Sequence, residues 1–345
     1  MREAVLLVGG QGTRLRPLTL TTPKPLLPVA GVPFLTHQLA ALRRAGIEHV
    51  VLATSYRAKI FTDTFGDDAG LGLELTYVSE HEPLGTGGAI RNASAGLRSG
   101  AGDPVVVLNG DVLSGHDIAG QVDFHERLGA DVTLHLVEVP DARAYGCVPT
   151  DDEGRVTDFL EKMDDPVTRW INAGSYVFDR AVIDEIPAAR VVSVERETFP
   201  RLLADGRDVR AWRETAYWID VGTPEALVRC SADVVTGIAP TAAQRQPPAE
   251  VWYAEATRPE AGAVVDGGSS VGPGVRIGEG AVVHASILMA GTVVGAGARI
   301  DHSVLGHEAT VGERSHLRGA VVADHADVPA GVALPDGARV EARSR

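Results

Sequence analysis

The chain has little cysteine, few aromatic residues and no long hydrophobic run. Its 345 residues include two cysteines, Cys147 and Cys230, which are too few for a disulfide framework and indicate a reducing compartment. No stretch approaches the ~20 consecutive apolar residues of a membrane-spanning helix. The first predicted strand begins by residue 4, which leaves no room for a signal peptide. We therefore expect a soluble, cytoplasmic protein.

Positive charge is also scarce. The chain has 32 Lys and Arg against 46 Asp and Glu, and its formal net charge is −14 at pH 7. This balance argues against binding of nucleic-acid polymers and of anionic membrane surfaces. A nucleotide stays compatible with it, because salt screens distant charges over ~10 Å while local donors act at contact. The length is sufficient for two domains.

The most informative stretch covers residues 5–28. An apolar run over 5–8 predicts a buried strand, and glycines follow it at positions 9, 10 and 12. The backbone amides of such glycines can form a concave anion site. Arg14 and Arg16 add planar, permanently charged donors, and Lys24 is held between two prolines. Neither the dinucleotide fingerprint nor the P-loop motif fits this spacing, although both bind phosphate.

The first two thirds of the chain follow an α/β pattern. Strands are predicted over 5–8, 49–53, 73–78 and 105–108, with a helix over 34–45. A strand, helix and strand in this order form a right-handed βαβ unit in a mainly parallel sheet. The last of these strands ends in Asn109-Gly110-Asp111. Because ligands collect at the carboxyl ends of such strands, Asp111 is a candidate metal ligand.

The last third has a different composition. A proline-rich passage over 239–259 predicts a linker or domain boundary, which we place at 239–262. The residues beyond it are dominated by glycine, valine and alanine. Aliphatic residues then recur six apart, with three five-residue steps that restore the phase every 17 residues. They are Val265, Val271, Ile277, Val283, Leu288, Val294, Ile300, Leu305, Val311, Leu317, Val322, Val328, Leu334 and Val340. This spacing is similar to the hexapeptide repeat of a left-handed parallel β-helix.

Several motifs together resemble the sugar-1-phosphate nucleotidylyltransferases. The first is G-G-x-G-T-R-L-x-P-L-T over 9–19, followed by P-K-P over 23–25. The others are L-G-T-x-G over 84–88, Y-G over 145–146, E-K over 161–162, N-A-G over 172–174 and W-x-D-x-G-T-P over 218–224. The resemblance implies a Rossmann-like nucleotidyltransferase domain with a mixed, mainly parallel sheet over 1–238. The linker at 239–262 and a β-helix over 263–345 follow, and we expect the exposed coil edges of the β-helix to form a homo-oligomer.

The resemblance also assigns roles to single residues. It places Leu7, Gly9, Gly10, Gly12, Thr13, Arg14, Gly85 and Asn109 on a nucleoside triphosphate. It places Gly146, Glu161, Lys162 and Asn172 on a sugar 1-phosphate, and Asp111 and Asp220 on Mg²⁺. Arg14, Lys24 and Lys162 are the expected catalytic residues, because they align and neutralise the reacting phosphates.

The implied reaction is attack by a sugar 1-phosphate oxygen on the α-phosphorus of the triphosphate. The acceptor is already an anion, so no general base is required. Within the family the chain is most similar to the guanylyltransferases of mannose 1-phosphate, so we expect GTP and mannose 1-phosphate as substrates. The family usually has proline after the Glu-Lys pair, whereas this chain has Met163. This departure leaves glucose 1-phosphate and a cyclitol 1-phosphate as alternative acceptors. A separate alternative is a non-catalytic subunit that keeps the fold and the β-helix and senses nucleotide-sugar.

Overall fold

The computed structural model describes residues 2–342 with the exception of 56–57, 161, 244–247 and 255–256. Contacts divide the chain into two compact units, each made of two segments. The first unit contains 1–10 and 38–218, and the second contains 11–37 and 219–345. None of the helices in the described part of the chain is long and apolar enough to cross a membrane.

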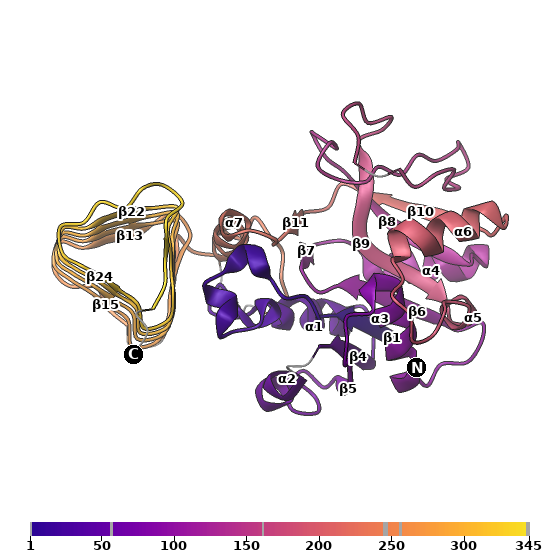
Figure 1. Ribbon diagram of the computed structural model, residues 1–345, viewed down its shortest axis with the longest axis horizontal. Helices are drawn as coiled ribbons and strands as arrows, with labels where there is room; N and C mark the ends of the chain where they lie inside the picture. Colours follow the sequence, from indigo (N-terminus) through magenta and orange to yellow (C-terminus); the bar gives the residue numbers. More distant parts are fainter. Residues whose placement is uncertain (1, 56–57, 161, 244–247, 255–256, 343–345) are drawn as a thin grey trace. The chain divides into compact units, whose positions relative to one another are not determined.

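The first unit is built on a seven-stranded sheet with the order β10-β8-β9-β6-β1-β4-β5 (Figure 1). Its strands are β1 (Glu3–Leu7), β4 (His49–Thr54), β5 (Glu74–Ser79), β6 (Pro104–Asn109), β8 (Val132–Glu138), β9 (Trp170–Asp179) and β10 (Val209–Glu214), and the short β7 (Val112–Ser114) follows β6. Strand β9 runs antiparallel to both of its neighbours, and the other pairs in the sheet are parallel. The prediction of a mixed, mainly parallel sheet is confirmed.

The order of the strands has a reversal next to β1. The chain places β1, β4 and β5 side by side and then returns to the other side of β1 with β6. Strands β1 and β6 pair in parallel, with Leu7 opposite Asn109. In open α/β sheets, ligands bind outside the carboxyl ends of the strands at such a reversal. Gly9 and Gly10 come shortly after the end of β1, and the Asn109-Gly110-Asp111 segment begins at the last residue of β6.

Helices cover both faces of this sheet. They are α1 (Phe34–Arg44), α2 (Ala58–Phe65), α3 (Gly85–Ala93), α4 (Ile118–Leu128), α5 (Arg180–Asp184) and α6 (Phe199–Ala204), and α1 confirms the helix predicted over 34–45. Ile90 of α3, Ile183 of α5 and Phe199 of α6 share one apolar cluster with Val107 of β6. Helix α4 packs on the opposite face, where His125 Nδ1 lies 3.0 Å from Thr133 Oγ1 of β8.

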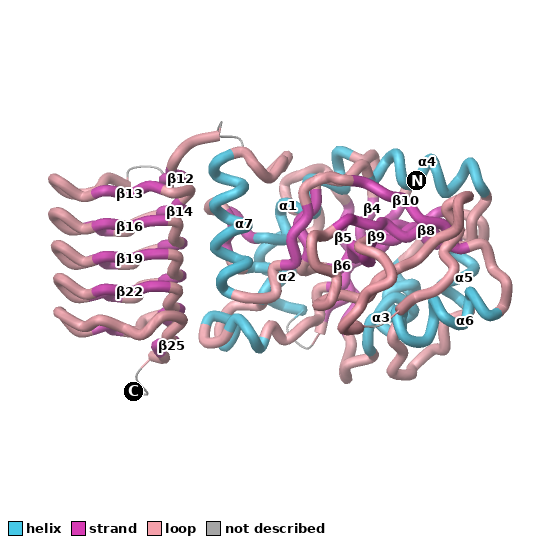
Figure 2. Tube along the Cα trace, turned by 90° about the horizontal axis from the view of Figure 1, so that it is seen from above, coloured by secondary structure: helices cyan, strands magenta, loops and turns pink. Residues whose placement is uncertain are grey.

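The second unit contains the loop after β1, a hairpin, helix α7 and a parallel β-helix. The hairpin joins β2 (Pro28–Val29) to β3 (Val32–Pro33), and α7 spans Pro224–Thr236 after the short strand β11 (Trp218–Asp220), which begins in the first unit. Figure 1 looks along the stack of β-helix coils, and Figure 2 shows the coils one above another.

Three parallel sheets form the β-helix. One contains β12 (Val251–Tyr253), β14 (Ser269–Val271), β17 (Ile287–Leu288), β20 (Val304–Leu305), β23 (Val321–Val322) and β25 (Arg339–Val340). The second contains β13 (Val264–Asp266), β16 (Val282–His284), β19 (Arg299–Asp301) and β22 (His316–Arg318), and the third contains β15 (Arg276–Ile277), β18 (Val293–Val294), β21 (Thr310–Val311) and β24 (Asp327–Val328). Strand β12 lies inside the segment that composition predicts as a linker, so this sheet begins before residue 263.

The predicted repeat matches the coils. Every aliphatic position of the series from Val271 to Val328 is buried, and strand partners such as Leu288 and Leu305 lie 17 residues apart. The glycine that follows the aliphatic residue has a steric reason, because a Cβ on Gly278 would lie 2.8 Å from the amide nitrogen of Ala296 in the next coil. The repeat in the sequence therefore follows from the stacking of the coils, because each coil needs a buried aliphatic residue and a following glycine at the same positions.

Candidate active site

Gly12 sets the shape of the loop after β1. Its φ is +59°, and a Cβ there would lie 3.0 Å from Thr19 Cγ2 and 3.1 Å from Lys24 Cβ. Its carbonyl accepts a hydrogen bond of 2.8 Å from the Thr19 hydroxyl. Both the backbone angle and the space therefore require glycine here. Of the three loop glycines, only Gly12 has positive φ, so a backbone angle that favours glycine applies to Gly12 and not to Gly9 or Gly10.

Arg14 lies against the segment that follows Asp220. It belongs to a short 3-10 turn over Thr13–Leu15. A Cβ on Gly222 would come 2.7 Å from Arg14 Nη2, so the guanidinium rests on this glycine. The second unit thus brings together four predicted residues (Gly12, Thr13, Arg14 and Lys24), and Arg14 lies beside the chain just after Asp220.

The strand ends of the first unit carry Asn109 and Asp111 on either side of a tightly packed glycine. The amide of Gly110 donates a hydrogen bond of 3.0 Å to the carbonyl of Leu7. A Cβ on Gly110 would lie 2.9 Å from Val8 Cγ1. This close approach holds the end of β6 against the end of β1. Leu7, Asn109 and Asp111 therefore stand at one edge of the sheet.

A buried tyrosine links two of the predicted residues. Asn172 Nδ2 donates to the Tyr176 hydroxyl at 2.8 Å, and the Asn109 side chain also hydrogen-bonds this phenol. Burial, reinforced by the Glu195 carboxylate, raises the pKa of Tyr176 above its ordinary value, so the phenol stays protonated. The tyrosine was not among the predicted residues. Asn172 and Tyr176 are four apart on a strand, where side chains alternate between faces, and that spacing was the available signal.

Gly174 makes room for this arrangement. Its φ is +75°, and a Cβ would lie 2.8 Å from Asn109 Nδ2. Its amide donates a hydrogen bond of 3.1 Å to Asn172 Oδ1. The N-A-G motif therefore fixes the two asparagine side chains through its backbone.

A cavity of about 380 Å³ in the first unit contains part of the predicted sugar-phosphate site. Its wall is formed by Thr86, Tyr145, Gly146, Phe159, Asn172, Ser193, Glu195 and Arg196. Gly146 and Asn172 were predicted together, and the structure brings them to one wall. Lys162 is exposed and does not line this cavity, and Glu161 lies outside the described residues.

The carboxylate of Glu195 is held in place on this wall. Its Oε2 accepts hydrogen bonds from Thr86 Oγ1 at 2.8 Å and from Ser193 Oγ at 2.9 Å. Glu195 and Arg196 both lie on a π-helical turn over Val194–Thr198. Together they offer an acceptor for hydroxyl groups and a cation for phosphate. No periodicity or motif in the sequence distinguished either residue.

The second glycine turn packs against the chain itself. Gly85 has φ +70°, and a Cβ would lie 2.6 Å from the carbonyl oxygen of Val192. The amides of Gly87 and Gly88 donate to the same oxygen at 2.8 and 3.3 Å. These glycines therefore hold the segment that leads to Glu195. The predicted contact of Gly85 with a nucleotide base stays a prediction.

The two predicted metal ligands fall in different units. Asp111 follows β6 in the first, and Asp220 ends β11 in the second. In the first unit, the indole nitrogen of Trp218 fixes the start of β11 by donating 2.9 Å to the carbonyl of Ala173. Asn109 Oδ1 is buried and has no hydrogen-bond partner among the described residues. A second hard oxygen near Asp111 fits the preference of Mg²⁺ for oxygen ligands.

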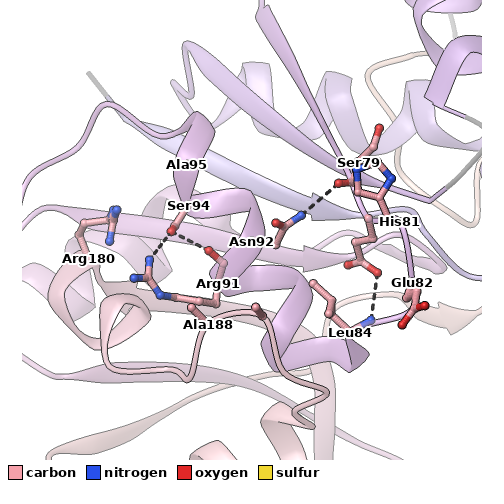
Figure 3. A pocket seen from close by; sticks show the side chains of 12 residues that line it. Ser79, His81, Glu82, Leu84, Arg91, Asn92, Ser94, Ala95, Arg180 and Ala188 are labelled. Carbon is pink, nitrogen blue, oxygen red and sulfur yellow. Dashed lines mark hydrogen bonds between the residues drawn. The ribbon is translucent and has the colours of Figure 1, made fainter.

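A further cavity of about 640 Å³ lies beside the carboxyl end of α3 (Figure 3). Asn92 Nδ2 donates to the carbonyl of Ser79 at 3.3 Å, and the amide of Leu84 donates to Glu80 Oε2 at 3.2 Å. Arg91 and Arg180 both reach Asp184, at 2.7 and 2.5 Å. None of the predicted site residues lines this cavity, so we do not assign a substrate to it.

Comparison with known proteins agrees with these features. The family model described as "Nucleotidyl transferase" matches residues 3–237, and the model described as "GMPPB C-terminal domain" matches 249–340. A mannose-1-phosphate guanylyltransferase of Mycobacterium tuberculosis is 54% identical over 290 residues, which cover 84% of this chain and 80% of that protein. A probable mannose-1-phosphate guanylyltransferase 1 of Oryza sativa subsp. japonica is 35% identical over 90% of this chain and 87% of its own length.

Among solved structures, HddC from Yersinia pseudotuberculosis in complex with GMP-PN is similar with a TM-score of 0.59. It is 30% identical, and the match covers 68% of this chain and 100% of HddC. The chain therefore belongs to the nucleotidyl transferase family and carries the C-terminal domain described as that of GMPPB.

Proposed function

We propose that this protein is a mannose-1-phosphate guanylyltransferase, which joins GTP and mannose 1-phosphate to give GDP-mannose and pyrophosphate. The observation that carries the proposal is the 54% identity with the Mycobacterium tuberculosis guanylyltransferase over 84% of the chain. The similarity to HddC, whose structure contains GMP-PN, supports a guanine nucleotide.

The nucleotide side of the site is assigned to the two strand ends and the loop. Leu7, Gly9, Gly10, Gly85 and Asn109 bind the nucleoside. Gly12, Thr13, Arg14 and Lys24 bind the triphosphate through loop amides, a hydroxyl and two cations. Arg14 suits this task because its guanidinium is pre-positioned on Gly222 and presents planar donors to phosphate oxygens.

The sugar phosphate is assigned to the cavity of about 380 Å³. Gly146 forms part of its wall, and Asn172 and Glu195 bind the hydroxyl groups of the sugar. Arg196 on the cavity wall and the exposed Lys162 neutralise the phosphate. Glu161, which lies outside the described residues, is assigned as a further ligand of the sugar hydroxyls. Side chains held by neighbours bind at lower entropic cost, and Asn172 and Glu195 are both held in this way.

Asp111 and Asp220 are the residues that would hold Mg²⁺, with Asn109 Oδ1 as a further oxygen. When bound, the ion supplies charge neutralisation for the phosphates. The chain's own residues orient the two anionic substrates against their mutual repulsion.

The reaction is a single displacement at phosphorus. A bond forms between an oxygen of the sugar's phosphate and the α-phosphorus. The bond from the α-phosphorus to the oxygen that bridges to the β-phosphate breaks, and pyrophosphate leaves with that electron pair. No proton has to move, because the attacking oxygen is already ionised at neutral pH. Arg14 and Lys24 stabilise the charge that develops on the pyrophosphate.

Pyrophosphate release with Mg²⁺, GTP and mannose 1-phosphate tests the proposal. We expect turnover with this pair and lower kcat/KM with ATP, dTTP, glucose 1-phosphate or a cyclitol 1-phosphate. The Asp111→Asn variant should lose at least about 100-fold in kcat, whereas Asp152→Asn, the same change in an exposed turn, should keep it. Absence of turnover with every pair would overturn the proposal. Binding of GDP-mannose without turnover would support the non-catalytic alternative.

We also propose that the β-helix forms a homo-oligomer. Strands β12 and β25 are the two edges of its six-stranded sheet, and edge strands present unpaired backbone groups to a partner. Light scattering coupled to size-exclusion chromatography measures the mass directly. A mass of one chain, 36.2 kDa, across the working concentration range would contradict this part of the proposal.

A further inference from the structure

Three arginines from distant parts of the sequence meet in one cavity of the second unit. Arg14 and Arg16 come from the loop after β1, and Arg339 comes from β25, the last strand of the β-helix. Together with Thr13, Thr223 and Glu225 they line a cavity of about 330 Å³. The function proposed above assigns Thr13 and Arg14 to the triphosphate. Neither that proposal nor the sequence motifs give a role to Arg339.

These guanidinium groups have no acidic partners in the described part of the chain. No ion pair involves Arg14, Arg16 or Arg339 there, whereas surface arginines such as Arg143 and Arg207 are paired with carboxylates. Glu225 is the one acidic residue among those that line the cavity, so the wall has three cations against one anion. An excess of two positive charges in one small cavity, in a chain of net charge −14, favours an anionic ligand.

The β-helix holds Arg339 and the loop in a fixed relation. Residues 339 and 340 pair in parallel with Val321 and Val322, so the arginine stands on a strand and not on a free tail. The Arg339 guanidinium donates a hydrogen bond to the carbonyl oxygen of Arg16. Five residues after Arg16, Thr21 Oγ1 donates a hydrogen bond of 2.7 Å to Asp324 Oδ2 of the β-helix.

The rest of the wall is compatible with phosphate oxygens. The hydroxyl of Thr13 is a donor, and its residue is exposed. Thr223 caps α7, with its Oγ1 accepting from the amide of Ala226 at 3.3 Å, so the cavity lies at the positive end of a 13-residue helix. The helix end adds to the field of the three arginines.

We propose that Arg339 completes a pyrophosphate-binding pocket with Arg14 and Arg16, and that the β-helix thereby contributes a side chain to the nucleotide half of the site. The ligand class is an inorganic di- or polyphosphate, which is the chemistry of both the leaving pyrophosphate and the terminal phosphates of the triphosphate. The proposal rests on the proposed function only for the identification of Arg14 with the triphosphate. Arg339 binds and positions, and no covalent step is assigned to it.

Calorimetric titration of the full chain with inorganic pyrophosphate and Mg²⁺ tests this directly. The Arg339→Gln variant should raise the Kd about tenfold, as expected for loss of a charge-assisted contact, and Arg339→Lys should recover part of that loss. The matched control is Arg299→Gln, which removes another exposed arginine of the same β-helix and should stay within about twofold of the wild type. Glu225→Gln should tighten binding, because it removes the opposing charge.

Steady-state kinetics provides the second measurement. Arg339→Gln should raise the KM for GTP, and for pyrophosphate in the reverse reaction, with the KM for mannose 1-phosphate unchanged. The proposed pocket would be contradicted if Arg339→Gln left the pyrophosphate Kd unchanged, or if Arg299→Gln raised this Kd as much as Arg339→Gln does. If the wild type binds pyrophosphate through Arg339 but shows no transferase activity, the pocket stands and the proposed function fails. If the wild type shows transferase activity but Arg339→Gln leaves the pyrophosphate Kd unchanged, the proposed function stands and the pocket fails.

Discussion

Buried histidines make the first unit sensitive to mild acid. His116 stacks on His135 with ring centroids 4.1 Å apart, and its Nε2 lies 3.1 Å from Ser175 Oγ. His125 belongs to α4, and its ring contacts Thr133 of β8. Burial lowers the pKa of both His116 and His125 to about 4 and holds the pKa of His135 well below its ordinary value. The fold therefore requires these rings to be neutral.

The sign and size of the effect follow from linkage. The unfolded chain binds a proton on each ring near pH 6.5, whereas the folded chain binds it only near pH 4 for His116 and His125. Stability is therefore complete above pH 6.5 and is lost as the pH falls toward 4. Each of these two histidines removes about 2 kcal/mol of unfolding free energy between pH 7 and pH 5. Two such losses approach the whole stability of a marginal domain, which is about 5 kcal/mol.

Urea denaturation followed by circular dichroism at 222 nm, repeated at pH 7, 6 and 5, measures the effect. The variant His116→Gln keeps a nitrogen donor for Ser175 and removes the titrating ring. Between pH 7 and pH 5 the unfolding free energy should decrease in both proteins. We expect the decrease to be about 2 kcal/mol smaller in His116→Gln than in the wild type. His81→Gln, at an exposed position of the same unit, is the control. The same pH dependence in His116→Gln and in the wild type would refute the reasoning.

Three further substitutions test single contacts. Gly222→Ala places a methyl group 2.7 Å from the Arg14 guanidinium and should raise the KM for GTP several-fold with little change in melting temperature. Ser286→Ala removes the hydroxyl that accepts a 3.0 Å hydrogen bond from the next coil and should lower the unfolding free energy by about 1–3 kcal/mol, measured by denaturation. Glu3→Gln weakens the hydrogen bonds that the buried Glu3 carboxylate accepts from the amides of Arg98 and Ser99, at 3.0 and 2.6 Å, and should lower the unfolding free energy by about 1–3 kcal/mol in the same assay. Wild-type values in any of these variants would contradict the assigned contact.

The fold was predictable where its signal is local. Apolar runs of four or five residues located β1, β4 and β6, and the helix predicted over 34–45 ends within one residue of α1. The six-residue spacing located the β-helix because each coil repeats the same burial requirement. Strand β9 was not predicted as a strand, although its N-A-G motif was recognised. Its antiparallel place between β6 and β8 is decided by long-range pairing, which leaves no periodic mark in the chain.

The site shows the same division. Gly12 was identifiable because positive φ favours glycine. Asn172 was identifiable because its motif predicts a side-chain amide that makes hydrogen bonds, as it does with Tyr176. Glu195 reaches its cavity only because the carbonyl of Val192 packs on the glycines of α3, about a hundred residues earlier in the chain. A Glu-Arg-Glu sequence on its own is typical of a solvated surface, so sequence reasoning had no basis for choosing it.

The loop with the strongest functional signature belongs, by its contacts, with the C-terminal part of the chain. Besides Thr21 and Asp324, the amide of Ala30 donates 3.0 Å to Ser231 Oγ, and the ring of Trp252 packs directly on Gly31. A β-helix that served assembly alone would need only its exposed edges and coil ends. Contacts with the loop instead make the stacked coils a rigid support for the residues assigned to the triphosphate. A substitution that disturbs the coils should therefore raise the KM for GTP more than the KM for the sugar phosphate. The cavity assigned to the sugar phosphate is built entirely from residues of the first unit.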